Sequence, residues 1–385
     1  MRRLTALLAA TAFTSLASAH ALAQPTSVTV DGGVTLNVAV AANGLEHPWG
    51  VDTLPGGALV ITEREGTMRV VSSDGQLSNP VRGLPRNIAV TGQGGLLDVT
   101  VDPDFASNQT IYFTYSEDGR GGLGTALAKA RLTDTNTATP RLIAVETLFS
   151  MNRKSRGGRH FGSRVVVAHD GTLFVTTGDR GDRPRSQDFG DHAGAVIRIN
   201  TDGSVPNDNP FLSQNDVAPE LFTKGHRNIQ GADIDPATGL LWTVEHGARG
   251  GDEINQPEAG KNYGWPVISF GRHYSGARIG EGTQKAGLEQ PVYHWDPSIA
   301  PSGLAIYDGE MFPEWQGDIL VGALRAQLMT RLDRGASGNI TGEEQMFAGQ
   351  FGRVRDVTVA DDGSIYIAID DNPGQILHIT RGNST

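Results

Sequence analysis

The sequence predicts an all-β protein, a six-bladed β-propeller of four-stranded antiparallel blades. A unit made of an apolar strand, a turn rich in Asp, Pro and Gly, and a second strand with β-branched residues recurs six times along the chain. The spacing of the units, roughly 45 to 70 residues, suits propeller blades with their loops. Long helical periodicity is absent, and the 50 glycines favour many short strands joined by tight turns.

The chain begins with a segment typical of a secretory signal peptide. Arg2 and Arg3 precede a mostly apolar run over 4–17, and the small residues of Ala21-Leu22-Ala23 fit a cleavage site. The apolar run is too short to span a membrane, and no second one follows it. A disordered amphipathic tail is the alternative. We expect residues 1–23 to be removed on export, which places the mature protein in the periplasm or outside the cell.

The six units follow one another along the rest of the chain. They cover 51–62, 96–115, 165–178, 232–245, 304–322 and 357–370. A third strand is expected after five of them, at 68–71, 126–131, 195–199, 328–332 and 376–379. The extra length is expected in loops at 133–158, 179–191 and 263–291. None of these loops reads as a linker, so residues 24–385 are expected to form a single propeller domain.

Composition excludes several classes of function. The chain has no cysteine, so disulfides, a thiolate nucleophile and a cysteine metal site are excluded. Its formal net charge of −11 argues against a nucleic acid or an anionic membrane as partner. A cluster of arginines in such an acidic chain therefore needs an explanation of its own.

The third unit places a histidine just before its first strand. The segment Gly157–Arg164 leads into a strand at 163–168, which returns through a short turn as a strand at 172–178. If these two strands pair, His160 lies opposite the region of Asp179. A carboxylate that holds one imidazole nitrogen leaves the other free as a base near neutral pH. His160 is therefore a candidate base, with Asp179 as its partner.

Positive charge gathers at the same end of the predicted propeller. The innermost strand of each blade runs along the central channel, so the residues near the ends of these strands meet around one mouth. Guanidinium groups bind planar carboxylates through two hydrogen bonds at a time, which predicts a polyanionic ligand. The alternative is that these arginines pair with nearby acids such as Asp356 and Asp370. The arginines are Arg227, Arg325, Arg353 and Arg355.

The fourth unit adds a weak metal signal. Strand pairing places Arg227-Asn228 opposite Gly247-Ala248, at the start of a glycine-rich bend that continues into acidic residues. Carbonyl oxygens together with carboxylates are the ligands that Ca²⁺ requires, but the spacing matches no EF-hand loop. A solvated acidic turn is the alternative. Downstream, Trp265 is expected to be a packing residue.

Five motifs follow one another along the chain: 92–97 (GQGGLL), 225–228 (GHRN), 251–255 (GDEIN), 261–266 (KNYGWP) and 353–356 (RVRD). In this order they resemble the soluble, exported aldose sugar dehydrogenases that use pyrroloquinoline quinone (PQQ) and calcium. The resemblance covers essentially the whole mature chain, and it also implies a six-bladed propeller. It implies the oxidation of aldose sugars at the anomeric carbon to lactones, with electrons passing through PQQ to an external acceptor.

The resemblance assigns roles to individual residues. It implies that His160 takes the proton of the anomeric hydroxyl, that Asp179 orients His160, and that Arg227 stabilises charge on the quinone. It implies one Ca²⁺ ion at the carbonyls of Gly247 and Ala248. The residues implied to hold PQQ are Gln93, Arg227, Asn228, Tyr274, Arg325, Arg353 and Arg355, and those implied for a second, structural calcium site are Glu253 and the Tyr263 carbonyl.

The chain also departs from parts of the family. Arg159 stands where some members have an acid, and Arg325 stands where others have a lysine. The loops that shape the glucose pocket of the dimeric, glucose-specialised branch are not recognisable. The chain resembles the shorter, broad-specificity branch, so a monomer or weak dimer is expected.

Two other functions suit the same fold. A calcium-dependent lactonase needs side-chain carboxylates and amides that converge on a metal in the channel, whereas the mouth positions here are basic. A propeller that only binds sugar or protein has no use for a His/Asp pair beside several arginines. Both alternatives are therefore weaker than the sugar dehydrogenase.

Overall fold

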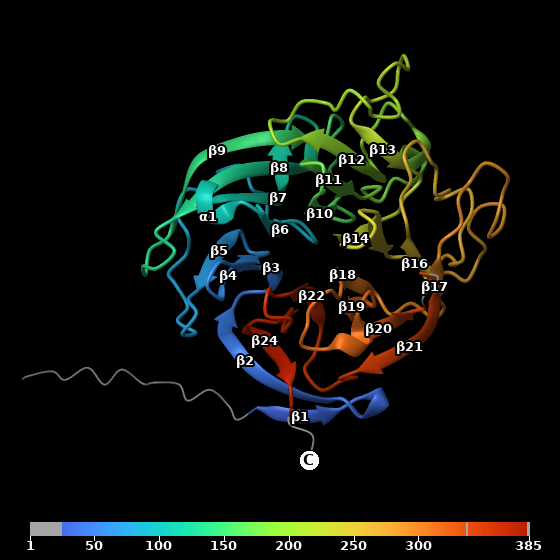
Figure 1. Cartoon of the computed structure of the whole chain (residues 1–385). Coiled ribbons are helices and arrows are strands. Elements are labelled where there is room, and N and C mark those ends of the chain that lie inside the picture. Colours follow the sequence, from blue (N-terminus) through green and yellow to red (C-terminus); the bar gives the residue numbers. More distant parts are fainter. Residues whose placement is uncertain (1–24, 336–337, 383–385) are drawn as a thin grey trace, which may run out of the picture.

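In the structure, a computed structural model that describes residues 25–335 and 338–382, six β-sheets surround a central channel (Figure 1). One strand of each sheet lies innermost, and these six strands contact one another in a closed ring. The six-bladed propeller predicted from the repeats is confirmed. The predicted signal peptide at 1–23 lies outside the described residues. The inner strands are β3 (Pro48–Leu54), β6 (Leu96–Val101), β10 (Gly162–Val167), β14 (Ile229–Ile234), β18 (Pro301–Ile306) and β22 (Val354–Val359).

Within the described residues, four blades have the expected four antiparallel strands. Blade two continues outward through β7 (Thr110–Gly119), β8 (Gly122–Thr133) and β9 (Arg141–Ser150), and blade three through β11 (Thr172–Thr177), β12 (Ala195–Asn200) and β13 (Leu221–Lys224). Blade four continues through β15 (Leu241–Glu245), β16 (Asp252–Asn255) and β17 (Tyr293–Trp295), and blade five through β19 (Ile319–Ala323), β20 (Leu328–Arg334) and β21 (Ile340–Met346). The helices are short turns: α1 (Phe105–Asn108), η1 (Asp31–Gly33), η2 (Arg183–Gln187) and η3 (Pro313–Trp315).

The other two blades show how the ring closes. Blade one has three strands, β3, β4 (Ala58–Glu63) and β5 (Thr67–Val71). Blade six adds β23 (Ile365–Ile369) and β24 (Gly374–Arg381) to β22, and two strands from the start of the chain, β2 (Thr35–Leu45) and β1 (Thr26–Thr29), complete it. Because β2 pairs with β24, both ends of the described chain lie in the same sheet (Figure 1). This pairing joins the last blade to the first, so no blade edge opens the ring.

One expected loop is wrong. The segment 133–158 was predicted as a long connection, but it contains β9, which pairs with β8 along the outside of blade two. Residues 143–147 of β9 are mostly exposed, because the outermost strand of a blade has solvent on one side. This strand does contain a short apolar run at 142–145, but three of these four residues are exposed, so the run does not mark a buried strand. The connections at 179–191 and 263–291 are irregular, as expected.

Hydrophobic packing holds neighbouring blades together. Between blades five and six, for example, Leu320 and Met329 pack in one cluster with Ile365 and Ile367, all fully buried. The inner strands add polar links between blades. The N–H group of Val101 donates to Asp52 at 2.7 Å and that of Ile306 to Asp233 at 2.8 Å, each across a blade boundary. Among the described residues no helix is long and apolar enough to cross a membrane.

Every inner strand has an irregular register near its first residues. In all six blades the pairing with the second strand shifts there, as between Gly162 and Val165 in β10 or Pro301 and Leu304 in β18. A β-bulge of this kind re-aims the backbone and is common beside active sites. Because all six bulges lie at the same end of the channel, the repeated fold turns residues of six blades toward one mouth.

Candidate active site

His160 and Asp179 form the pair that the strand register predicted. Nδ1 of His160 lies 2.6 Å from Oδ1 of Asp179. An ionised carboxylate can only accept hydrogen bonds, so Nδ1 carries the proton and Nε2 is left as an acceptor. His160 lines the larger of two adjoining cavities at the mouth. Nε2 is therefore the ring nitrogen available to a molecule bound there.

The backbone around His160 is held in an unusual conformation. His160 itself has φ 55° and Ser163 has φ 96°, values that cost free energy for residues other than glycine and that cluster at functional sites. The N–H group of His160 donates to Oε1 of Gln93 at 2.7 Å. On the opposite strand, a Cβ atom at Gly178 would lie 2.2 Å from the carbonyl oxygen of His160. Only glycine at 178 allows this approach.

Asp179 is fixed on both of its oxygens. Oδ1 also accepts the N–H group of Gly181 at 2.7 Å, and Oδ2 accepts Nε1–H of Trp265 at 2.9 Å. Trp265 packs in the interior as predicted, but its indole has this second role that the sequence analysis missed. A tryptophan between a glycine and a proline gives no signal for a partner that lies 86 residues away.

Burial and neighbouring charges tune the pair in opposite directions. Burial lowers the pKa of His160 below its ordinary value, and the nearby Arg227 guanidinium lowers it further, against the raising effect of Asp179. Burial opposes ionisation of Asp179, but the hydrogen bond and charge of His160 and the N–H group of Gly181 outweigh it, so the pKa of Asp179 is lowered. The pair therefore has a neutral imidazole beside an ionised carboxylate at neutral pH.

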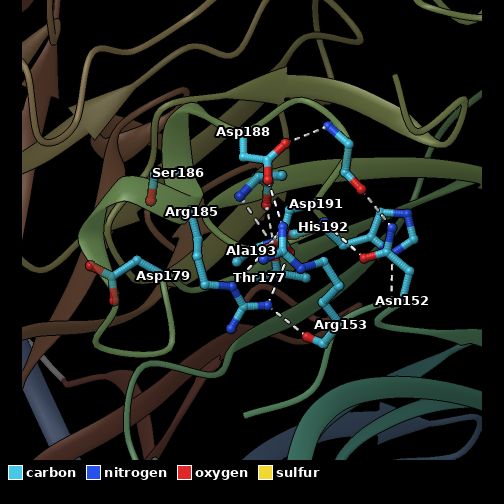
Figure 2. A network of polar contacts seen from close by, with 12 residues as sticks. Asn152, Arg153, Thr177, Asp179, Arg185, Ser186, Asp188, Asp191, His192 and Ala193 are labelled. Carbon is cyan, nitrogen blue, oxygen red and sulfur yellow. Dashed lines mark hydrogen bonds and ion pairs between the residues drawn. The ribbon is translucent and has the colours of Figure 1, made fainter. Parts of the chain in front are cut away.

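The connection from β11 to β12, which carries Asp179, is pinned behind the site by a polar network (Figure 2). Nε of Arg185 donates to Asp191 at 2.7 Å, and Nη2 donates to the carbonyl of Arg153 at 2.6 Å. At the outer end of the connection, Nη1 of Arg153 lies 2.5 Å from Asp188. The hydroxyl of Thr177 accepts the N–H group of Ala195. These bonds hold Asp179 in place without touching it.

Lys224 supports the same connection from within the protein. Its ammonium group is fully buried and donates to the carbonyls of Arg185, Asp191 and Ala193 at 3.1, 2.8 and 2.6 Å. Three carbonyl acceptors satisfy the three donors of an ammonium group. Lys224 thus ties β13 to the connection that bears Asp179. The sequence offered no signal for it, since a single lysine is normally exposed.

The sequence-predicted residues gather in two cavities that adjoin at the mouth. The larger, about 760 Å³, is lined by Gln93, His160, Arg227, Gly247, Ala248, Tyr274 and Arg325. The smaller, about 210 Å³, is lined by Asn228, Arg353 and Arg355 together with Trp49 and Gln230. Gln93, His246 and Ala300 line both. Repetition of the fold has therefore brought together residues that lie far apart in the chain.

The four predicted arginines differ in how they are paired. Arg353 and Arg355 share one carboxylate, with guanidinium nitrogens 3.2 and 3.6 Å from Oδ2 of Asp370. The local pairing considered as an alternative is thus correct for Asp370, which also contacts His47. It is wrong for Asp356, whose partner is Arg164 at 2.7 Å.

The guanidinium groups of the other two arginines donate hydrogen bonds only to carbonyl oxygens among the described residues. Arg227 and Arg325 donate to the carbonyls of His246 and Ser298, both at 3.0 Å, and neither has an ion pair among the described residues. Nε of the buried Arg355 has no partner there either. The mouth therefore has more positive charge than its own acids neutralise.

Two further sets of residues offer oxygen ligands of the kind that a metal ion binds. Among the described residues, no hydrogen bond ends on the carbonyl oxygens of Gly247, Ala248 or Tyr263, which leaves these oxygens free for another partner. Glu253, Tyr263 and Glu245 line a small space of about 10 Å³, which shares Arg227, His246 and Gly247 with the larger cavity. Burial and repulsion from Glu245 raise the pKa of Glu253 well above its ordinary value. No group of three or more His, Cys, Asp or Glu side chains suited to a metal occurs in the described part of the chain.

Comparisons with known proteins agree on one family. Residues 45–378 match the family model of glucose/sorbosone dehydrogenases. The aldose sugar dehydrogenase YliI of Escherichia coli is 38% identical over 353 residues, which are 91% of this chain and 94% of that protein. The apo-form crystal structure of the soluble aldose sugar dehydrogenase from Escherichia coli superposes with a TM-score of 0.86 at 38% identity and covers 90% of this chain and 100% of that one. The PQQ-bound aldose sugar dehydrogenase of Streptomyces coelicolor gives 0.75 at 27% identity, with 90% and 98% coverage.

Proposed function

The chain belongs to the glucose/sorbosone dehydrogenase family, and on this basis we propose that it oxidises aldose sugars at the anomeric carbon to lactones with PQQ and Ca²⁺ as cofactors. The observation that carries the proposal is the neutral His160 beside an arginine-rich cavity. A relative with a PQQ-bound structure supports the choice of quinone. An external acceptor would then remove the electrons.

The residues of the two cavities fit PQQ, which carries three carboxylates and an ortho-quinone. The guanidinium groups of Arg227 and Arg325 have no acidic partner among the described residues, and Nε of Arg355 is buried without any. For the buried Arg227 and Arg355, unneutralised charge and an unpaired donor cost free energy until an anion satisfies them. The residues that would hold PQQ are Gln93, Arg227, Asn228, Tyr274, Arg325, Arg353 and Arg355.

Calcium fits the carbonyl oxygens at the same mouth. Gly247 and Ala248 line the larger cavity, and their unbonded carbonyls are hard oxygen ligands of the kind that Ca²⁺ prefers. Ligand oxygens from PQQ would complete the coordination. A second ion would be held by Glu253 and the Tyr263 carbonyl, where it would relieve the repulsion between Glu253 and Glu245.

The protein's own residues supply the acid–base chemistry and the electrostatics. When bound, PQQ would be the oxidant that accepts the hydrogen of C1 together with two electrons. Nε2 of His160 takes the proton of the anomeric hydroxyl, and Asp179 stabilises the imidazolium that forms. Arg227 is fixed near His160 by its bonds to Glu245 and His246, so its positive charge is in place before the reaction starts.

The test of the proposed function is reconstitution. Purified protein stripped of cofactors is mixed with PQQ and Ca²⁺, and glucose-dependent reduction of an artificial dye is followed. Dye reduction that requires both additions is expected. Hydrolysis of a lactone without PQQ would instead identify a lactonase. The lining disfavours this outcome, because among the described residues Asp296 is the one carboxylate that lines the larger cavity. A protein inert in both assays would be a binding module.

The pH dependence follows from the His160–Asp179 pair. His160 must be neutral to act as a base, so kcat/KM is expected to fall as the pH decreases through its pKa, which burial places below the ordinary value. In Asp179→Asn, the carboxylate that raises this pKa is lost, so the acid limb moves to lower pH while the plateau falls by roughly 10²-fold. Asp134→Asn, in an exposed ion pair with Arg141 on the outside of blade two, is the control and keeps the wild-type profile. An acid limb that stays in place in Asp179→Asn contradicts the assignment.

Cofactor affinity distinguishes the two arginines that share Asp370. Arg355 is buried and its Nε has no partner, whereas the side chain of Arg353 is 46% exposed. Arg355→Met is expected to raise the Kd of PQQ by about 10- to 100-fold, the loss of a charge-assisted hydrogen bond. Arg353→Met is expected to raise it less, because water screens its charge. Quenching of tryptophan fluorescence measures the Kd without turnover, since Trp49 lines the same cavity. Equal effects would contradict this order.

We also propose that residues 1–23 direct export, which places the enzyme in the periplasm or outside the cell, and that it acts as a monomer or weak dimer. The resemblance to aldose sugar dehydrogenases supports both proposals. Mass measurement of the mature N-terminus and of the native protein tests them.

A further inference from the structure

Three arginines face one another across a small hairpin at the mouth. The N–H group of Arg249 donates to the carbonyl of Arg272 at 3.1 Å, and the two residues form an antiparallel bridge. Arg272 forms a second antiparallel bridge with Arg278. Between them the chain turns through His273, whose N–H group donates to the carbonyl of Ala277 at 2.8 Å. We name this group of Arg249, Arg272 and Arg278 the arginine ladder.

The arginine ladder is electrostatically unfavourable as it stands. Side chains of directly opposed residues lie on the same face of a ribbon, and like charges in such pairs destabilise it. All three side chains are exposed, and none makes a hydrogen bond or ion pair with another described residue. Although the chain has a net charge of −11, Asp296 is the one carboxylate among the described residues that lines the same cavity, and it forms no ion pair with the arginine ladder. The arrangement favours an anion that binds from outside.

The position of the arginine ladder indicates which anion it binds. Arg249 and Arg272 line the cavity of about 760 Å³ that also holds His160. Neither belongs to the set that would hold PQQ, in which Arg227, Arg325, Arg353 and Arg355 supply the positive charge. A molecule whose anomeric carbon reacts at His160 lies in this same cavity, with its remote end against another part of the wall. An acceptor that docks outside need not enter the cavity.

We propose that the arginine ladder recognises a negative charge on the sugar, so that the enzyme prefers acidic aldoses, the uronic acids, over neutral ones. A carboxylate matches the fork of a guanidinium group in geometry and charge. The inference rests on the proposed function and leaves its chemistry unchanged: the proton of the C1 hydroxyl goes to His160, and the hydrogen of C1 leaves with two electrons to the same oxidant. The sugar's carboxylate is bound and does not react.

The experiment compares D-glucuronate with D-glucose in the reconstituted enzyme at low ionic strength. We expect kcat/KM to be at least about tenfold higher for glucuronate, and the ratio to fall as salt screens the arginines. In the double variant Arg249→Gln/Arg272→Gln the glucuronate-to-glucose ratio is expected to drop by about tenfold or more, mainly through KM. The double variant Arg131→Gln/Arg141→Gln, on β8 and β9 of blade two, removes the same charge far along the chain from the hairpin and keeps the wild-type ratio.

Three results would overturn the inference. The first is a wild-type enzyme that does not prefer glucuronate. The second is a glucuronate-to-glucose ratio that both double variants change equally. The third is an effect that depends on the acceptor: if Arg249→Gln/Arg272→Gln slows glucose oxidation with ferricyanide but not with an uncharged quinone, the arginine ladder serves the acceptor. Failure of the wild-type enzyme to oxidise any sugar would overturn the proposed function as well, and the two failures are therefore distinguishable.

Discussion

Replacing His160 with alanine is expected to lower kcat by about 10²–10⁴-fold, the loss that follows removal of a general base. The Kd of PQQ is expected to change little, because alanine keeps the backbone N–H group that donates to Gln93, and the imidazole itself bonds Asp179 rather than a residue that would hold the cofactor. The measurement is cofactor reduction at saturating glucose in a stopped-flow instrument, with PQQ affinity determined separately by titration. A variant with wild-type turnover would remove His160 from the mechanism.

The backbone of His160 requires a second variant as a control. At φ 55° an alanine is strained, whereas asparagine tolerates the left-handed conformation better. His160→Asn therefore keeps the local backbone while it removes the base. If both variants lose turnover to a similar extent, the missing imidazole is the cause. If only His160→Ala is slow, the loss comes from a displaced segment, and the assignment of His160 as the base is wrong.

The propeller could be predicted because its inner strands repeat. The strands nearest the channel are buried on both sides, so their apolar runs and the turns between them stand out in the sequence. The outer parts of the blades could not be read in this way. Strand β9 has five consecutive exposed residues at 143–147, and β2 belongs to the last blade although it lies near the start of the chain. Neither burial periodicity nor order along the chain identifies such strands.

The site was predictable to the extent that it follows the strand register. The facing positions of His160 and Asp179 follow from the hairpin between β10 and β11, and the gathering of arginines follows from the rotational repeat. Supporting residues were not predictable. Trp265 reaches Asp179, and Lys224 reaches three carbonyls, through loops whose paths depend on tertiary packing. A sequence pattern reports which face a residue occupies, but not which distant group it contacts.

Arg164 is another residue whose distant contacts could not be predicted from the sequence. It belongs to the segment Gly157–Arg164 that drew attention to the site, yet its guanidinium group is buried in the channel away from His160. Nη1 lies 2.8 Å from Asp98 and 2.7 Å from Asp356, and Nε donates to the carbonyl of Gln230 at 2.5 Å. It thereby joins blades two, three, four and six. Below the basic mouth, the inner strands around the channel are held together by the carboxylates of Asp98 and Asp356, which bind the buried guanidinium group of Arg164.

Replacing Arg164 with methionine is therefore expected to destabilise the protein by about 3–5 kcal/mol, the usual cost of breaking a buried ion pair from one side. The variant keeps much of the apolar stem but leaves the carboxylates of Asp98 and Asp356 without their cation. The free energy of unfolding from urea titration measures the loss. Arg141→Met breaks an exposed pair with Asp134, in which both side chains are more than 40% exposed, and is expected to cost less than about 1 kcal/mol.

The pH dependence separates lost charge from lost packing in Arg164→Met. Burial raises the pKa of Asp98 to about 7 even beside Arg164, and it raises that of Asp356; without the cation both rise further. An aspartate with a folded-state pKa above its unfolded value makes the folded state bind more protons, so its ionisation lowers stability as the pH rises. The deficit of Arg164→Met is therefore expected to be larger at pH 8 than at pH 5. Asp356→Asn in the same variant should restore part of the stability at pH 8, because one oxygen remains to accept the N–H group of Val51. A deficit independent of pH would mean that Arg164 stabilises the channel by packing alone.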